Sequence, residues 1–314
     1  MEAVKLNQKR NMSKGCFQNS SIPKWLSANN QSSYHPRMKQ TKYLMNVSDH
    51  SCRPLYPQVL LYNRIFKTAS TTMASFLEKC GKKLKYVIRK EQTEEWSNRK
   101  RSHPILIRIR ASAKRNKRRY KRLLAVAHFY FRIDSGIKMK HTYINLLREP
   151  IDRFISHYYY ARSPHRWPKK LRRLKAKGHW NVTLEQCLEK QYEGCKWNIM
   201  TRFFCGPEGF CKTGNMEALS QAKYNMLHYY SSIGVVEHLN EFIQVLHKRL
   251  RKFIIKPPRT LSKTFVTTGV EKKPISNRVM TRIVQANQAD IELYNYGKTL
   301  FLKQAKQCGI KVKT

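Results

Sequence analysis

Lys67 lies in a run of small hydroxyl residues, a combination that is suited to binding an anion. The lysine supplies a point charge, and the hydroxyl groups can donate hydrogen bonds to several oxygen atoms. No glycine lies between Asn63 and Thr72, so the G-x-x-x-x-G-K-[ST] order of a Walker loop is absent and a nucleotide kinase is disfavoured. The hydroxyl residues are Thr68, Ser70, Thr71 and Thr72.

The residues around this run predict a strand, a loop and a helix. Gln58–Leu61 is a short apolar run, which is typical of a strand buried on both faces. Met73, Phe76 and Leu77 recur at helical spacing until Gly81 offers a C-cap. Free backbone N–H groups and the positive end of the helix dipole meet at the loop, which predicts a phosphate or sulfate site. An ordinary capped helix with a surface lysine is the alternative, because serine and threonine are favoured caps.

A second strand end meets a helix start further along the chain. Thr142–Leu147 has the pattern of a buried strand, Arg148 follows it, and Pro150 opens an amphipathic helix that contains Ser156. Strands that alternate with helices predict an α/β fold, with a mainly parallel central sheet flanked by helices. Ligands of such sheets bind outside the carboxyl ends of the strands, where both candidate sites would lie. The pattern therefore predicts a ligand with two separated anionic groups.

The other elements are predicted from their apolar periodicity. Residues 1–57 are polar and lack a steady period, which predicts a poorly ordered stem or tail before a folded part at residues 58–314. Leu123–Phe131 is a buried strand pattern with His128 inside it, and Ile105–Ile109 alternates like a short exposed strand. Further patterns predict strands at Leu84–Ile88 and Ile233–Val236, helices at Pro168–Lys177, Glu217–Tyr230 and Glu237–Leu250, and a long helix from about Asn277 to Lys306.

The charge of the chain points to a polyanionic partner. The formal net charge is +44, from 63 Lys+Arg against 19 Asp+Glu. Such an excess fits nucleic acid, an anionic membrane or an acidic polysaccharide. No helix-turn-helix, zinc-finger or RNA-binding pattern appears, so nucleic acid is disfavoured, and no metal-binding constellation appears either.

The cysteines indicate an oxidising compartment. Two close pairs, Cys187/Cys195 and Cys205/Cys211, are interpreted as two small disulfide loops. Four of the five N-x-[ST] sequons fall within the first 46 residues, as in a lumenal stem. However, no stretch is long enough to span a bilayer, and Met1–Lys5 begins no apolar leader. Two alternatives stay open: the targeting segment is missing from this chain, or the lumenal assignment is wrong.

Together the motifs resemble the heparan sulfate and uronyl 2-O-sulfotransferase family. Tyr62–Thr72 is similar to its 5′-phosphosulfate loop, and Tyr143–Tyr160 is similar to its 3′-phosphate motif. The similarity covers roughly Val59 to Lys306, and the two cysteine spacings look like the family's two disulfides. Three further motifs follow in family order: Phe203–Gly206 with Cys211, Gln221–Asn225 and Gly234–Leu239.

The resemblance implies a sulfotransferase catalytic domain at residues 58–314. Such an enzyme transfers a sulfuryl group from 3′-phosphoadenosine 5′-phosphosulfate to the 2-hydroxyl of a uronic acid in a glycosaminoglycan such as heparan, dermatan or chondroitin sulfate, without a metal. The partner is then an acidic polysaccharide rather than nucleic acid, and the resemblance implies homo-oligomers and a single-pass type II membrane protein of the Golgi lumen. The alternative is a relative that keeps the fold, has lost the catalytic base and only binds polyanions.

The resemblance also assigns roles by position. His128 would be the catalytic base, and Lys67 would stabilise the leaving phosphate oxygen. Arg172 and Arg173 would bind the acceptor from a basic segment, and Lys272 and Lys273 belong to a loop that would close over the nucleotide. The 5′-phosphosulfate would be held by Arg64, Lys67, Thr68, Ser70, Thr71 and Thr72, and the 3′-phosphate by Arg148 and Ser156.

The base is where the sequence departs from the family pattern. An ungapped alignment places the family's histidine at Val126, whereas this chain has His128. Positions two apart in a strand face the same side, so His128 would point into the same cleft, displaced by roughly 6.5 to 7 Å. A secondary role for His128, His103 as a weaker base, and an ordinary core histidine are the alternatives. Phe66 is a milder departure, because related loops often carry proline or glycine there.

Overall fold

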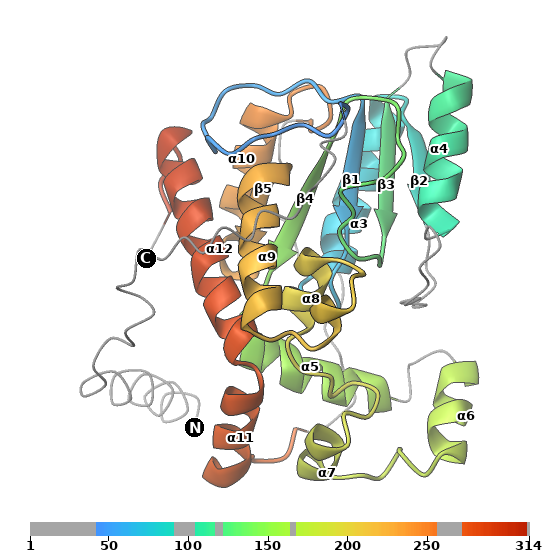
Figure 1. Cartoon of the computed structure of the whole chain (residues 1–314), viewed down its shortest axis with the longest axis vertical. Helices are drawn as coiled ribbons and strands as arrows, with labels where there is room; N and C mark the ends of the chain where they lie inside the picture. The colour runs from blue at the N-terminus through green and yellow to red at the C-terminus, as the bar shows by residue number, and fades with distance from the viewer. Residues whose placement is uncertain (1–41, 91–103, 117–121, 164–167, 256–271, 313–314) are drawn as a thin grey trace. The chain divides into compact units, whose positions relative to one another are not determined.

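The computed structural model describes residues 42–90, 104–116, 122–163, 168–255 and 272–312. Within these residues five strands form one sheet in the order β2-β3-β1-β4-β5, and every neighbouring pair is parallel. This arrangement confirms the predicted α/β fold with a parallel central sheet flanked by helices (Figure 1). The strands are β1 (Val59–Asn63), β2 (Val87–Lys90), β3 (Leu123–Ala127), β4 (His141–Leu147) and β5 (Tyr230–Val235).

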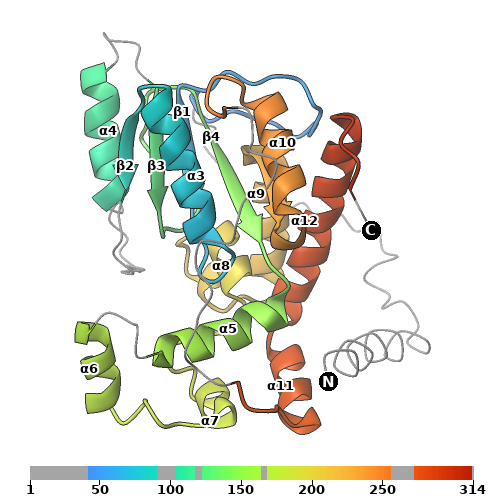
Figure 2. The ribbon, with the colours of Figure 1, turned by 180° about the vertical axis from the view of Figure 1, so that it is seen from behind.

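Helices lie on both faces of the sheet. The helix α3 crosses behind the sheet in Figure 1 and in front of it in Figure 2, which shows the molecule from behind, whereas α9 lies in front in Figure 1. The helices are α3 (Ser70–Lys83), α4 (Pro104–Asn116), α5 (Pro150–Arg162), α6 (Pro168–Ala176), α7 (Leu184–Glu189), α8 (Ile199–Cys205), α9 (Met216–Tyr229), α10 (Leu239–Arg249), α11 (Asn277–Ala286) and α12 (Gln288–Gln307).

The order of the strands creates a switch point between β1 and β4. The chain leaves β1 through α3 toward β2 on one side, and it leaves β4 through α5 toward β5 on the other side. Tyr62 of β1 pairs with Val126 of β3 and with Ile144 of β4, so these three strands end at one edge of the sheet. Parallel sheets bind ligands outside this edge, where the connections diverge.

A buried polar network holds the ends of the central strands together. Asn145 of β4 donates from Nδ2 to the carbonyl of Asn63 (2.8 Å) and to its Oδ1 (3.0 Å). Asn63 in turn donates from Nδ2 to the hydroxyl of Tyr230 in β5 (2.9 Å). Buried amides need such partners, and a satisfied network favours one strand register. The network therefore fixes the base of the loop that follows Asn63.

Two predicted strands differ from the structure. Ile105–Ile109 belongs to the helix α4, in which Ile105 and Ile109 are buried one turn apart and Ile107 is 54% exposed. Alternation over so few residues fits a helix face as well as a strand, so this prediction was wrong. The strand predicted at Leu123–Phe131 ends at Ala127, because the chain then turns away from the sheet edge.

Two predicted helix details also need correction. Gly81 lies inside α3 instead of capping it, and a Cβ at this position would lie 2.8 Å from Cδ1 of Ile88 in β2. The glycine thus permits close packing of the helix against the sheet. The long helix predicted from Asn277 is broken at Asn287 into α11 and α12, and the Asn287 side chain donates to the carbonyl of Ile283.

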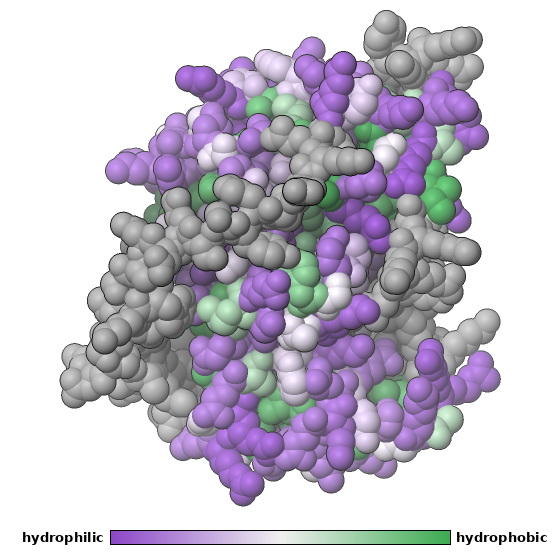
Figure 3. Space-filling model, in the orientation of Figure 1, coloured by the Kyte–Doolittle hydropathy of each residue, from purple (hydrophilic) through white to green (hydrophobic). Residues whose placement is uncertain are grey.

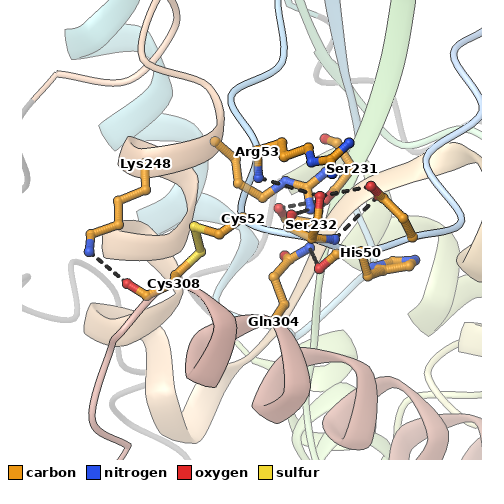
Figure 4. Close-up of a disulfide and its surroundings, with 11 residues drawn as sticks. His50, Cys52, Arg53, Ser231, Ser232, Lys248, Gln304 and Cys308 are labelled. Atoms are coloured by element: carbon orange, nitrogen blue, oxygen red, sulfur yellow. Dashed lines mark hydrogen bonds between the residues drawn. A yellow bond between two sulfur atoms is a disulfide. The ribbon is translucent and has the colours of Figure 1, made fainter.

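Three disulfides join the described residues. Cys187–Cys195 and Cys205–Cys211 confirm the two predicted loops. A third, Cys52–Cys308, joins positions 256 residues apart, and no spacing in the sequence pointed to it (Figure 4). Beside this third bond, Gln304 of α12 donates to the carbonyl of His50 (3.2 Å).

The segment 42–57 contacts the rest of the folded part. Leu44 forms a parallel bridge with His141 next to β4, and Val47 and His50 are buried. These residues lie on the stem side of the boundary predicted at residues 57 and 58. The division of the chain at that boundary stays a prediction, and the described part of the predicted stem packs against β4 and α12.

The face of the molecule seen in Figure 3 is mostly polar. Hydrophilic residues cover most of the coloured surface in Figure 3, and hydrophobic ones form small separate patches. Among the described helices, none combines the length and apolar character needed to cross a bilayer. In the same part of the chain, no three His, Cys, Asp or Glu side chains gather in a way that suits a metal ion.

Candidate active site

The loop after β1 reverses sharply before α3 begins. Lys67 and Ala69 both have left-handed backbone conformations, with φ of 64° and 50°. Such a conformation costs a residue with a side chain about 1–2 kcal/mol, and this kind of strain concentrates at functional sites. The buried Thr68 hydroxyl donates to the carbonyl of Ile65 (3.1 Å) and closes the turn. The hydroxyl of Thr68 therefore supports the loop from inside.

The N-terminus of α3 is open. Its N-cap residue, Ala69, provides no side-chain hydrogen bond, and the first turn contains no acidic residue. The first N–H groups of a helix have no partner within the helix, so an uncapped start is suited to an anion. Ser70 and Thr72 are buried at this start, while Thr71 is exposed. The geometry favours an anion cradle over an ordinary capped helix.

Arg64 lies across the start of α3. Its Nη2 donates to the Thr71 hydroxyl (3.3 Å), and its Nε is buried without a hydrogen-bond partner among the described residues. Burial lowers the pKa of this guanidinium, and weaker interactions with Tyr62 and Glu78 oppose the shift. Buried cations with unfilled donors are costly unless a ligand pairs with them.

Lys67 and Arg148 are brought together at the switch point. Arg148 follows β4, and its Nη1 donates to the carbonyl of Lys67 (3.2 Å). The Lys67 ammonium lies 4.1 Å from the centre of the Tyr160 ring of α5, within the range of cation–π attraction. Burial, together with the charges of Arg148 and Lys272, lowers the pKa of Lys67 to about 8.

The start of α5 differs from the start of α3. Glu149 is the N-cap, and its carboxylate accepts hydrogen bonds from the backbone N–H groups of Ile151 (3.0 Å) and Asp152 (2.6 Å). This helix start is therefore already capped by a carboxylate of the chain itself. A second anion site would be formed by the Arg148 guanidinium and by Ser156, which is half-buried further along α5.

His128 lies at the same edge of the sheet. It follows the last residue of β3, and its Nδ1 lies 2.9 Å from the carbonyl oxygen of Arg64. A carbonyl oxygen only accepts, so Nδ1 carries the proton and the lone pair of the neutral ring is on Nε2. Val126 is enclosed within β3 and has no proton to transfer. Since β3 ends at Ala127, the argument from strand alternation does not apply to His128.

The other predicted site residues have fewer contacts with Lys67, Arg148 and His128. Lys272 is exposed, and its charge acts on Lys67, while the backbone N–H of Lys273 donates to the Tyr159 hydroxyl (3.0 Å). Arg172 and Arg173 are exposed on α6, and no described contact joins them to the centre. Residues 267–271 of the predicted closing loop, which spans residues 267–273, and His103 lie outside the described residues.

Sequence reasoning assigned no role to three α5 residues that border the site. Tyr160 lies under the Lys67 ammonium, Tyr159 contacts the backbone of Lys273, and His157 is nearly parallel to the Phe66 ring. The sequence did contain a signal for Tyr160: it lies four residues after Ser156, so the two share one face of a helix.

These residues fit a ligand with several negative charges. Arg64, Lys67, Arg148 and Lys272 contribute four positive charges to this region, and the charges of Arg148 and Lys272 help to lower the pKa of Lys67. An open helix start and the buried Arg64 Nε supply donors. A bound polyanion would relieve the repulsion and fill these donors.

The fold is thus a parallel α/β sheet with a candidate anion site after its first strand. The sequence profile of the sulfotransferase family matches residues 56–297, and the chain belongs to this family. Membership implies 3′-phosphoadenosine 5′-phosphosulfate as the co-substrate.

Individual relatives narrow the comparison. The chain is 28% identical to heparan sulfate 2-O-sulfotransferase 1 of Homo sapiens over 260 residues, which cover 77% of this chain and 70% of that protein. The Xenopus laevis protein of the same name is also 28% identical over 260 residues. A heparin sulfate O-sulfotransferase of Drosophila melanogaster is 30% identical over 203 residues, or 61% of this chain and 56% of that protein. The chain is thus a distant relative of these enzymes.

Proposed function

We propose that this protein transfers a sulfuryl group from 3′-phosphoadenosine 5′-phosphosulfate to the 2-hydroxyl of a uronic acid in a glycosaminoglycan such as heparan, dermatan or chondroitin sulfate. The observation that carries the proposal is the meeting of three strand ends. His128 follows β3, the Lys67 loop follows β1 and Arg148 follows β4, and hydrogen bonds connect all three. A proton acceptor and a set of cations therefore lie at one edge of the sheet.

The cations have separate tasks in this proposal. Arg64, Lys67 and the hydroxyls of Ser70, Thr71 and Thr72 hold the 5′-phosphosulfate against the start of α3, with Thr68 supporting the loop. Arg148 and Ser156 hold the 3′-phosphate, and Lys272 and Lys273 approach from the segment before α11. When bound, the co-substrate supplies a sulfuryl group that is transferred in line, with negative charge growing on the departing phosphate oxygen.

Lys67 is suited to stabilising that charge. Its ammonium is fixed over the Tyr160 ring, and a pKa of about 8 leaves it mostly protonated at neutral pH. A cation that is partly removed from water before the reaction stabilises developing charge more strongly than a hydrated one. The left-handed backbone at Lys67 is the kind of strain that concentrates at functional sites.

His128 acts as the general base. The acceptor hydroxyl has a pKa far above neutral, so its proton must leave while the oxygen attacks sulfur. The hydrogen bond from Nδ1 to the Arg64 carbonyl selects the tautomer whose Nε2 can accept that proton. The same hydrogen bond remains in the imidazolium that results.

The acceptor is recognised by charge. Arg172 and Arg173 project from α6, which contains five basic residues and no acidic one. Exposed cations attract a sulfated or carboxylated chain over a distance set by the ionic strength. We assign α6 to acceptor binding on this basis and on the resemblance of Arg173 to a substrate-binding arginine.

Transfer of radiolabelled sulfate to desulfated heparin tests the proposal. We expect incorporation by the wild type and a loss of roughly 10²–10⁴-fold in His128→Ala, the usual contribution of a general base. His247→Ala on α10 is the matched control. The His247 ring is hydrogen-bonded to the carbonyl of Ile254, and neither residue belongs to the candidate site. Calorimetry with 3′-phosphoadenosine 5′-phosphate should detect binding by both variants.

Failure of transfer would favour the alternative assignment. A folded wild type that binds the nucleotide and heparin but incorporates no sulfate would be a polyanion-binding relative that keeps the fold. A wild type that binds neither, together with an unchanged Arg148→Glu variant, would refute the whole anion-site assignment.

A further inference from the structure

Phe66 packs against two imidazole rings. Its ring centre lies 4.0 Å from that of His128, with the ring planes 10° apart, and 5.5 Å from that of His157, with the planes 6° apart. The three residues come from three elements: the loop after β1, the end of β3 and the middle of α5. All three are buried.

The Phe66 ring is itself held in place. Phe203 of α8 meets it edge-on, with ring centres 6.0 Å apart and planes 89° apart. The hydrogen bond from the Thr68 hydroxyl to the Ile65 carbonyl fixes the backbone on both sides of Phe66. Interiors packed in this way have few alternative rotamers.

His128 is therefore constrained in two independent ways. The Arg64 carbonyl, 2.9 Å from Nδ1, fixes which edge of the imidazole points into the loop. Stacking on Phe66 fixes the plane in which the ring lies. The hydrogen bond and the stacking together determine the direction in which Nε2 points, which neither would determine alone.

We infer that Phe66 is a positioning residue for His128: it sets the plane of the imidazole so that Nε2 faces the acceptor hydroxyl. The inference rests on the proposed function, because it assumes that His128 is the base. A base must lie within hydrogen-bond reach of the proton that it removes, so a small rotation of the ring is enough to slow the transfer.

An aromatic ring at this position also favours the product of the proton transfer. His128 becomes a cation when it accepts the proton, and the face of an aromatic ring attracts a cation within about 6 Å. The centre-to-centre distance of 4.0 Å satisfies this condition. A leucine could fill most of the volume but would offer no such face. Phe66 and His128 are also the two places where the sequence departs from the pattern that it resembles, and the structure shows them in contact.

Phe66→Leu and Phe66→Tyr separate positioning from simple packing. Phe66→Leu keeps an apolar side chain and loses the ring, whereas Phe66→Tyr keeps the ring. We expect Phe66→Leu to lower kcat at least tenfold, within the range that base catalysis supplies, with little change in KM for the nucleotide. We expect Phe66→Tyr to restore most of the rate. Phe204→Leu in α8, which removes a buried ring tilted against Tyr230 instead, is the matched control and should lower stability while leaving kcat unchanged.

NMR of histidine-labelled protein tests the stacking of Phe66 on His128 independently of the reaction rate. The Phe66 ring current shifts the Cε1 proton of His128 upfield, so Phe66→Leu should move this signal downfield and Phe204→Leu should leave it in place. The signal is assigned from the spectrum of His128→Ala.

The outcomes distinguish the inference from the proposed function. A wild type that transfers no sulfate would refute the proposed function, and the role of Phe66 with it. An active wild type whose Phe66→Leu variant keeps its kcat, or whose His128 signal does not move, would refute the role of Phe66 alone. If Phe66→Leu does not fold, the rate of Phe66→Tyr and the wild-type ring-current shift of His128 test the role of Phe66 instead. A Phe66→Tyr variant as slow as His128→Ala would contradict positioning by the ring.

Discussion

Lys67 combines a strained backbone, a ring beneath its ammonium and two neighbouring cations. Burial and these cations lower its pKa to about 8, below the value of a free lysine. A bound polyanion favours the charged form and raises the pKa again. Binding then requires uptake of a proton above the pKa of the free protein, so the affinity must fall as the pH rises through this value.

The pH dependence of nucleotide binding tests this account of Lys67. We expect the affinity for 3′-phosphoadenosine 5′-phosphate, measured by calorimetry, to fall about tenfold between about pH 7 and about pH 9. Lys67→Arg stays charged over this range and should show a nearly flat profile. Equal affinities of the wild type at the two pH values would contradict the lowered pKa.

At the scale of elements, the loop between β1 and α3 carries a measurable strain. Ala69 adopts φ of 50° at the N-cap, a conformation that glycine accepts without a steric cost. We expect Ala69→Gly to raise the free energy of unfolding by about 0.5–1 kcal/mol in urea titrations, because the relief of strain exceeds the added chain entropy.

An exposed helical alanine gives the matched comparison for Ala69. Ala111 lies in the interior of α4 and is exposed, so Ala111→Gly should lower the free energy of unfolding by about 1 kcal/mol. The change from alanine to glycine should thus raise the free energy of unfolding at position 69 and lower it at position 111. A destabilised Ala69→Gly would show that the left-handed conformation is not strained.

The sequence predicts those elements whose burial is uniform. All five residues of β1 and all seven of β4 are buried, and a strand enclosed on both faces leaves an unbroken apolar run. The helix α4 was mistaken for a strand because Ile105, Ile107 and Ile109 alternate, although only Ile105 and Ile109 lie on its buried face. The break at Asn287 had no glycine or proline to mark it.

The candidate site could be predicted as a set of residues but not as an arrangement. The Lys67 loop and Arg148 were predicted to lie together because each follows a strand that ends at the same edge of the sheet, and the two are in contact. The cap by Glu149 and the packing of Phe66 depend on where side chains point, which spacing does not encode. Such details belong to tertiary contacts, and their sequence signals are weak.

At the scale of the whole molecule, the positive charge is unevenly neutralised. Arg282 of α11 pairs with Glu185 (2.6 Å) and Glu189 (2.7 Å). In contrast, Arg172 and Arg173 of α6 form no ion pair with any described carboxylate. Charges without internal partners are the ones that remain available to a polyanion.

Charge reversal on α6 tests where an acidic polysaccharide binds. We expect Arg172→Glu/Arg173→Glu to elute from immobilised heparin at a clearly lower salt concentration than the wild type, because contacts between exposed charges are screened by salt. Lys303→Glu/Lys306→Glu on α12 changes the net charge equally, and α12 and α6 lie at opposite sides of both ribbon views, α12 beside the sheet and α6 below it (Figures 1 and 2). Equal shifts for the two variants would show that net charge alone governs binding.

The Cys52–Cys308 bond closes by far the longest loop of the three disulfides. In the chain-entropy model the stabilisation grows with loop length, so Cys52→Ser/Cys308→Ser should cost roughly 2–5 kcal/mol in urea unfolding. Cys187→Ser/Cys195→Ser opens a loop between positions only 8 residues apart, and its cost should be about half as large. A larger cost for the short loop would mean that local packing outweighs chain entropy.

The same bond has a practical consequence for anyone who handles the protein. Cys52 precedes β1 and Cys308 follows α12, so a protease cut anywhere between them yields two fragments that stay covalently attached. In electrophoresis without a reducing agent, such a cleaved molecule would run as a single species, like the intact protein. Only after thiol treatment would the fragments separate and the damage become visible.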